Sequence, residues 1–236
     1  ALGRKLKPAS ISELYAFIAV IVYSGIVRIQ NSKKYWSTDS KWPTHPPSKY
    51  ISRTRFEQLK RYFKISNTED ERKKFESSKN GIDENWYAKV EQLFSSIMNM
   101  SQKLFNSGSN LAVDEVMVRF TGRSQDTYRI HNKPIPKGFK IIAICGHDGY
   151  VINAIPISRS RKGNTKDILI DKLTYTESIV VRLIESVLTE RKDIVLYCDN
   201  YYSSKRLFNY LRSRNIAAVG TCKSHQIPES IKSKIA

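Results

Sequence analysis

Asp114 and Asp199 are the two residues of this sequence whose type and position are best suited to chemistry. Asp114 lies in the apolar segment LAVDEVMVRF, and Asp199 ends the segment DIVLYCDN. Both segments are typical of β-strands, where aspartate is uncommon because its short side chain competes for backbone hydrogen bonds. Close carboxylates repel each other, and they are held together best by Mg²⁺ or Mn²⁺, which prefer oxygen ligands. Two such ions can bind the attacking and leaving oxygens in phosphodiester displacement.

Simpler roles remain open for both aspartates. Asp199 could cap a helix that begins near Ser203, which is a common use of aspartate. Asp114 could form an ion pair with an arginine elsewhere in the sheet. The residue types alone therefore leave a metal site and a structural role as alternatives.

The charge of the chain indicates a polyanionic partner. The 236 residues include 40 Lys and Arg against 22 Asp and Glu, which gives a formal net charge of +18. A basic field of this size fits a long polyanion such as DNA or RNA better than a small ligand. The alternative is a basic protein with no nucleic-acid partner. With 40% hydrophobic and 26% charged residues, the chain is expected to be globular.

Two basic segments supply candidate DNA contacts. The first, FTGRSQDTYRIHNKPIPKGFK, follows the Asp114 segment directly, and the second is SRSRKGNTK. Cations there would position phosphates, and a tyrosine could stack on a base. The predicted DNA-binding residues are Arg123, Tyr128, Arg129, Lys133, Lys137, Lys140, Arg161 and Lys162. For each of them a solvated loop is the alternative. A phosphate-binding loop of the GKS/T type is absent from the sequence, so no nucleotide partner is predicted.

The first part of the chain is predicted to be mostly helical. Ser10 and Glu13 form a capping box, which predicts a helix from Ile11 to about Ile29 that is apolar on most faces and hence buried. Its apolar stretch is too short to span a membrane, and Glu13 argues against a signal peptide, so we expect an intracellular protein. Helical spacing recurs over residues 54–63 and 86–105. We therefore predict a helical region over residues 1–108.

The chain changes character after Gly108. Strands are predicted over residues 111–120, 139–146, 150–157, 194–198 and 216–221, with helices over residues 175–188 and 203–212. This order predicts an α/β (α+β) domain over residues 109–236, with a mixed sheet flanked by helices. If the first and fourth strands are neighbours, Asp114 and Asp199 meet at one edge of the sheet. The order, with acids at these points, is that of the RNase H-like nuclease and transposase fold.

Several segments together resemble the piggyBac transposase family and its domesticated derivatives. The resemblance runs from ELYAFIAVIVYSGIVRI and SRTRFEQLKRYFKISN through LAVDEVMVRFTGR to YCDNYYSSKRLFNYLRSRN, and so covers nearly the whole chain. The strings DNYYSS and NKPxxxGFK are its most specific signals.

The resemblance implies a function and a site. Asp114 and Asp199 would be the first two members of a three-aspartate site that binds two divalent ions, Mg²⁺ or Mn²⁺. Residues 1–108 would be the first part of a dimerisation and DNA-binding region, in a nuclear homodimer that cleaves transposon ends and joins them to TTAA targets. The third aspartate would follow an insertion domain that begins where the sequence stops, at Ala236. We therefore expect an incomplete site, and an inactive fragment, within these residues.

Two other classes of function remain open. A domesticated, non-catalytic protein that binds or tethers DNA would keep the fold and the basic surface without cleaving DNA. A structural or protein-interaction module would use the same basic surface on acidic partners. DNA binding with a steep salt dependence but without cleavage would favour the first alternative, and failure to bind DNA would favour the second.

Overall fold

The computed structural model describes residues 7–66, 86–106, 108–158, 168–187 and 193–222. Contacts divide the chain into two compact units, Ala1–Ile65 and Ser66–Ala236. This division differs from the boundary after residue 108 that the sequence indicated. Helix α5, Ala88–Leu104, packs on strand β4, Val151–Ile157, and so belongs with the sheet. The dimerisation and DNA-binding role of residues 1–108 stays a prediction.

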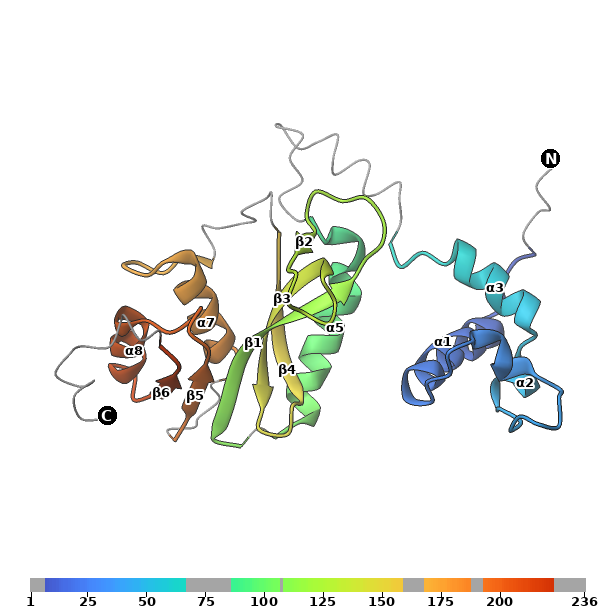
Figure 1. The fold of residues 1–236 in the computed structure, drawn as a ribbon, viewed down its shortest axis with the longest axis horizontal. Coiled ribbons are helices and arrows are strands. Elements are labelled where there is room, and N and C mark those ends of the chain that lie inside the picture. The colour runs from blue at the N-terminus through green and yellow to red at the C-terminus, as the bar shows by residue number, and fades with distance from the viewer. Residues whose placement is uncertain (1–6, 67–85, 107, 159–167, 188–192, 223–236) are drawn as a thin grey trace. The chain divides into compact units, whose positions relative to one another are not determined.

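The first unit is helical, as expected. It contains α1 (Ile11–Ile26), the short 3₁₀ helix η1 (Ser32–Trp36), α2 (Pro47–Tyr50) and α3 (Arg53–Tyr62) (Figure 1). Its small core consists of Phe17, Val20, Ile51 and Leu59. An ion pair of 2.8 Å between Arg55 and Glu13 ties the start of α3 to the first turn of α1.

Helix α1 begins as predicted but is less buried than its composition suggested. The capping box of Ser10 and Glu13 is formed, and the helix ends at Ile26 rather than near Ile29. Only Phe17 and Val20 of this helix are buried. Most of its other apolar residues are partly or largely exposed, because the unit is too small to surround a helix that is apolar on most faces. None of the helices described is long and apolar enough to span a membrane.

The second unit is built on a six-stranded mixed sheet. The strand order is β2-β3-β1-β5-β6, and β4 also pairs with β3. Strands β1, β3 and β4 are antiparallel neighbours, whereas β5 and β6 run parallel to β1. The bounds are β1 Asn110–Arg119, β2 Tyr128–Arg129, β3 Lys137–Gly146, β4 Val151–Ile157, β5 Val195–Cys198 and β6 Ala217–Gly220. This arrangement confirms the mixed sheet, with the RNase H-like strand order.

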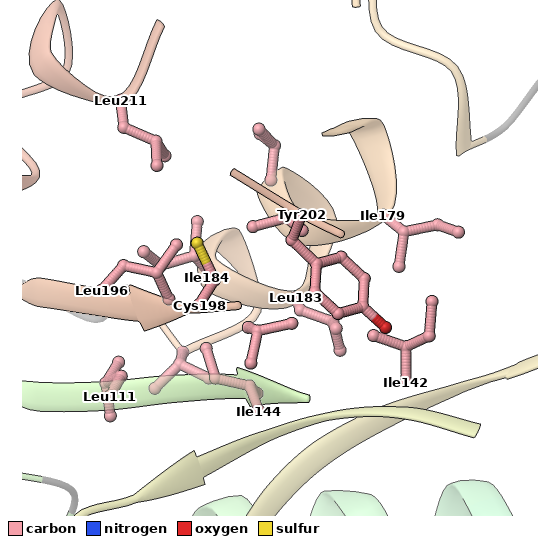
Figure 2. Packing of buried hydrophobic residues seen from close by; sticks show 14 of the residues in the cluster. Leu111, Ile142, Ile144, Ile179, Leu183, Ile184, Leu196, Cys198, Tyr202 and Leu211 are labelled. Atoms are coloured by element: carbon pink, nitrogen blue, oxygen red, sulfur yellow. The ribbon is translucent and has the colours of Figure 1, made fainter. Parts of the chain in front are cut away.

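Helices cover both faces of this sheet (Figure 1). On one face, α7 (Tyr175–Glu185) contributes Ile179 and Leu183 to a core that includes Leu111 and Val113 of β1, as Figure 2 shows for part of the cluster. Residues of α8 (Lys205–Arg212) complete the same core. On the other face, the Ser101 hydroxyl of α5 donates a hydrogen bond of 2.5 Å to a backbone carbonyl of β4. The two helical layers thus lie on opposite faces of the sheet.

Strands β1 and β3 approach each other so closely at one point that only glycine fits. A Cβ atom added to Gly138 would overlap the carbonyl oxygen of Val118 on β1. Gly138 is the glycine of the string NKPxxxGFK. The close approach of β3 to the strand that carries Asp114 therefore explains why this string contains a glycine.

Candidate functional site

The sheet register brings Asp114 and Asp199 to equivalent positions on neighbouring strands. Strands β1 and β5 are parallel, and the last pair in their register joins Val113 to Cys198. The next residue in each strand direction is an aspartate, and both aspartates are exposed. Both aspartates therefore lie one residue beyond the last register pair of β1 and β5, and their shared role as metal ligands stays a prediction.

The Asp199 side chain organises the turn that leaves β5. Its Oδ1 atom accepts hydrogen bonds from the backbone N–H groups of Tyr201, at 2.9 Å, and Tyr202, at 3.4 Å. The Ser203 hydroxyl donates to the Asp199 carbonyl oxygen at 2.7 Å. The N-cap of α8 is Ser204, whose hydroxyl accepts from the Leu207 N–H. Capping of α8 therefore does not account for Asp199.

Both aspartates keep oxygens that are accessible to a ligand. Asp114 uses Oδ1 to accept a hydrogen bond from the Glu115 N–H at 2.6 Å. Across the described ranges, neither the Asp114 Oδ2 nor the Asp199 Oδ2 takes a hydrogen bond, and neither aspartate forms an ion pair with an arginine. Adjacent carboxylate oxygens are the donor set that a hard divalent cation prefers. The described residues contain no group of three or more His, Cys, Asp or Glu side chains that could hold a metal.

The predicted DNA-binding residues differ in their exposure and in their partners. Arg123 and Arg129 are exposed between β1 and β3, and Lys137 is exposed at the first position of β3. Tyr128 is half-buried, and its hydroxyl donates to the Ser158 carbonyl oxygen at 2.8 Å. Arg161 and Lys162 lie outside the described residues.

The remaining two, Lys133 and Lys140, are bound by Glu115. Lys140 Nζ lies 2.6 Å from Glu115 Oε2, and Lys133 Nζ lies 3.2 Å from Glu115 Oε1. The side chain of Lys140 is only 9% exposed. Burial opposes ionisation of Glu115, but the hydrogen bonds from Lys140 and Lys133 outweigh it and hold the pKa of this carboxyl below its usual value. Contact with DNA by Lys133 and Lys140 stays a prediction, and their structural partner is Glu115.

Sequence reasoning missed Glu115 and a second carboxylate, Glu177. Glu177 is buried at the first turn of α7. It accepts hydrogen bonds from the backbone N–H of the N-cap residue Thr174, from the Ser204 hydroxyl at 2.5 Å and from Arg206 Nε at 2.9 Å. Burial acts against it, but these hydrogen bonds lower the pKa of Glu177 to about 2. Glu177 thus joins the start of α7 to the start of α8, next to the Asp199 turn. The Thr174-Glu177 spacing of a capping box was the available signal in the sequence.

Comparison with known families gives the class of this protein, which is that of the transposases. The family model described as "Transposase IS4" matches residues 2–236. The chain belongs to this family, of IS4/piggyBac-type transposases, which confirms the resemblance to piggyBac transposases. The family implies a divalent metal cofactor.

One solved structure shows the same fold, and a second gives a weaker match. The structure of the piggyBac transposase synaptic complex with hairpin DNA matches with a TM-score of 0.73 at 23% sequence identity. The match covers 98% of this chain and 48% of that one, so this chain spans about half the length of its structural relative. The Mos1 transposase paired-end complex with the left transposon end matches with a TM-score of 0.30 at 10% identity, over 100% of this chain and 74% of that one.

Proposed function

We propose that this chain forms the core of a DNA transposase that cleaves and joins phosphodiester bonds at transposon ends. The observation that carries the proposal is the position of Asp114 and Asp199, each directly after the last register pair of β1 and β5. In a chain of this family and of net charge +18, paired exposed carboxylates fit metal-dependent chemistry on DNA.

In this proposal each aspartate contributes an oxygen to the bound cation, which is Mg²⁺ or Mn²⁺. When bound, such ions activate the attacking oxygen and stabilise the leaving oxygen. Asp199 accepts hydrogen bonds from the N–H groups of Tyr201 and Tyr202, which hold its carboxylate in one orientation. Little conformational entropy is therefore lost when the cation binds. Arg123, Arg129 and Lys137 would contact the DNA backbone, because phosphate contacts set the position of the duplex.

The proposal extends to partners. DNA is the expected substrate, and the solved relatives are a transposase complex with hairpin DNA and one with a transposon end. We also propose a TTAA target, a homodimer and a nuclear location, because the family resemblance implies them. Sedimentation of the protein with and without DNA would test the homodimer.

The direct test is cleavage by the protein with its complete natural sequence. Cleavage of DNA that carries the element's own ends should require Mg²⁺ or Mn²⁺, and Asp114→Ala or Asp199→Ala should abolish it. Asp148→Ala, in the turn between β3 and β4, is the matched control and should leave cleavage intact. Cleavage that survives both site substitutions would contradict the assignment.

A non-catalytic DNA-binding or tethering protein is the second candidate. It is favoured by the exposed Arg123, Arg129 and Lys137, which could bind DNA without the aspartates. Salt-dependent DNA binding by the complete protein, together with no cleavage under any divalent metal, would establish it in place of the transposase. A protein that binds no DNA at moderate salt would contradict both candidates and favour a protein-interaction module.

A further inference from the structure

Tyr201 is largely exposed, although both its backbone and its ring contact other groups of the protein. Tyr201 lies two positions after Asp199 and is 59% exposed. Its backbone N–H donates to the Asp199 carboxylate at 2.9 Å. Its ring meets the ring of the buried Tyr202 edge-on, with 5.0 Å between centroids and an interplanar angle of 89°. The backbone of Tyr201 is therefore tied to the carboxylate, and its side chain projects from the same turn.

An ion pair between a buried lysine and a partly buried glutamate lies next to this ring. Lys140 Nζ is 4.7 Å from the Tyr201 ring centroid and 2.6 Å from Glu115 Oε2. A cation within about 6 Å of a ring is attracted by its π-face, and the attraction is stronger when the cation is removed from water. Glu115 follows Asp114 in β1, so this chain of contacts runs from one aspartate to the turn of the other.

The ion pair also makes Lys140 unsuited to contact a phosphate. The Lys140 side chain is only 9% exposed, and moving its ammonium group toward a phosphate would leave the Glu115 carboxylate partly buried and without its closest partner. The group that this arrangement presents to the surface is instead the Tyr201 ring. A ring that is already fixed loses little conformational entropy when a ligand packs against it.

We infer that Tyr201 is a stacking surface for one terminal or unpaired base of DNA bound at Asp114 and Asp199, with Lys140 and Glu115 holding the ring in place. This inference rests on the proposed function, because it takes DNA as the ligand of the site. Every base has a π-face, so stacking on tyrosine tolerates any sequence. Inside a duplex both faces of a base are covered by neighbours, whereas an end or an unpaired base leaves one face open.

The test uses DNA in which 2-aminopurine reports on stacking. The complete protein is titrated with a short duplex that ends in a single-stranded overhang, and 2-aminopurine replaces the overhang bases one at a time. We expect fluorescence to be quenched at one overhang position by the native protein and by Tyr201→Phe. Tyr201→Ala should lose most of the quenching and bind the overhang DNA about tenfold more weakly. Tyr210→Ala is the matched control, and this variant should quench as the native protein does. Tyr210 also has a cationic neighbour, since Arg214 lies 4.7 Å from its ring, but it is near the other end of α8.

A second pair of variants tests the support beneath the ring. Lys140→Met combined with Glu115→Gln removes both charges and keeps similar volumes, so the protein should fold while quenching decreases. Quenching and affinity unchanged in Tyr201→Ala would overturn the inference. Tyr201-dependent quenching in a protein that cleaves no DNA would support the inference while contradicting the transposase proposal, so the two can fail separately.

Discussion

The Glu177 carboxylate accepts a hydrogen bond of 2.5 Å from the Ser204 hydroxyl, which joins the first turn of α7 to the N-cap of α8. Helix α8 starts directly after the turn that Asp199 organises. A buried carboxylate on another helix therefore fixes the end of the loop that carries a candidate metal ligand. Local sequence around Asp199 does not contain this constraint.

Glu177 should make the stability of the protein depend on pH in the acid range. Its pKa is about 2 in the folded protein against an ordinary value of 4.5. Because the folded value is the lower one, this stabilisation is complete above about pH 4.5 and is lost as the pH falls toward 2. A shift of this size corresponds to about 3 kcal/mol.

Urea unfolding at several pH values measures this effect. Glu177→Gln should lower the free energy of unfolding at neutral pH by about 2–3 kcal/mol and flatten its dependence on pH between 2 and 4.5. Glu185→Gln is the control, since Glu185 pairs with Arg182 and Arg214 at the surface and should contribute at most about 1 kcal/mol. Equal losses for the two variants would contradict the special role of Glu177.

Gly138→Ala should disturb the pairing of β1 with β3. The added methyl group would overlap the Val118 carbonyl, and neither backbone can move without separating the strands. We expect thermal unfolding to show a loss of about 1–3 kcal/mol or more. Gly25→Ala in α1 is the matched control, because nothing lies within 4 Å of the position that its methyl group would take, and it should be neutral or slightly stabilising. A neutral Gly138→Ala would show that the strands are not so close.

Tyr202→Phe should be tolerated although the residue is almost completely buried. Within the described part of the chain its hydroxyl has no hydrogen-bond partner, and burial together with nearby acidic groups raises the pKa of this tyrosine. Removing the hydroxyl therefore removes a desolvated polar group, and stability should stay the same or rise by about 1 kcal/mol. Tyr202→Ala should cost about 3–5 kcal/mol because its ring fills the core under the Asp199 turn. A strongly destabilising Tyr202→Phe would reveal a hydrogen bond that this structure does not contain.

The basic residues should separate into two groups when DNA affinity is measured against salt concentration. Each of Arg123→Ala, Arg129→Ala and Lys137→Ala should lower the slope of log K against log salt by about 0.9, as expected when one phosphate contact is lost. Lys140→Met should leave that slope unchanged, since Glu115 already neutralises this lysine. A reduced slope for Lys140→Met would place its ammonium group on a phosphate.

Much of the fold could be predicted from local pattern. Apolar segments indicated β1, β3 and β4, and helical spacing indicated α7, with differences of a few residues at the ends. The sequence placed Asp114 near Asp199 only on the condition that the first and fourth predicted strands are neighbours, and β1 does pair with β5. Strand β2, with only two residues, and the short helices η1 and α2 are too brief to leave a periodic signal.

What could not be predicted depends on tertiary pairing. Lys140 reads as one more cation of a basic segment, and only the register of β1 with β3 shows that it meets Glu115. The exposure of α1 likewise depends on how few elements the first unit contains, which the composition of the helix does not reveal.

The central claim is that Asp114 and Asp199 are ligands of the same divalent cation. Mn²⁺ binding followed by electron paramagnetic resonance tests this claim most directly. In the complete protein, Asp114→Asn and Asp199→Asn should each weaken Mn²⁺ binding by about tenfold or more, or about 1.4 kcal/mol. The double variant should lose little beyond either single variant, because both act on one site. Asp148→Asn should bind as the native protein does. Native Mn²⁺ affinity in both single variants would contradict the claim.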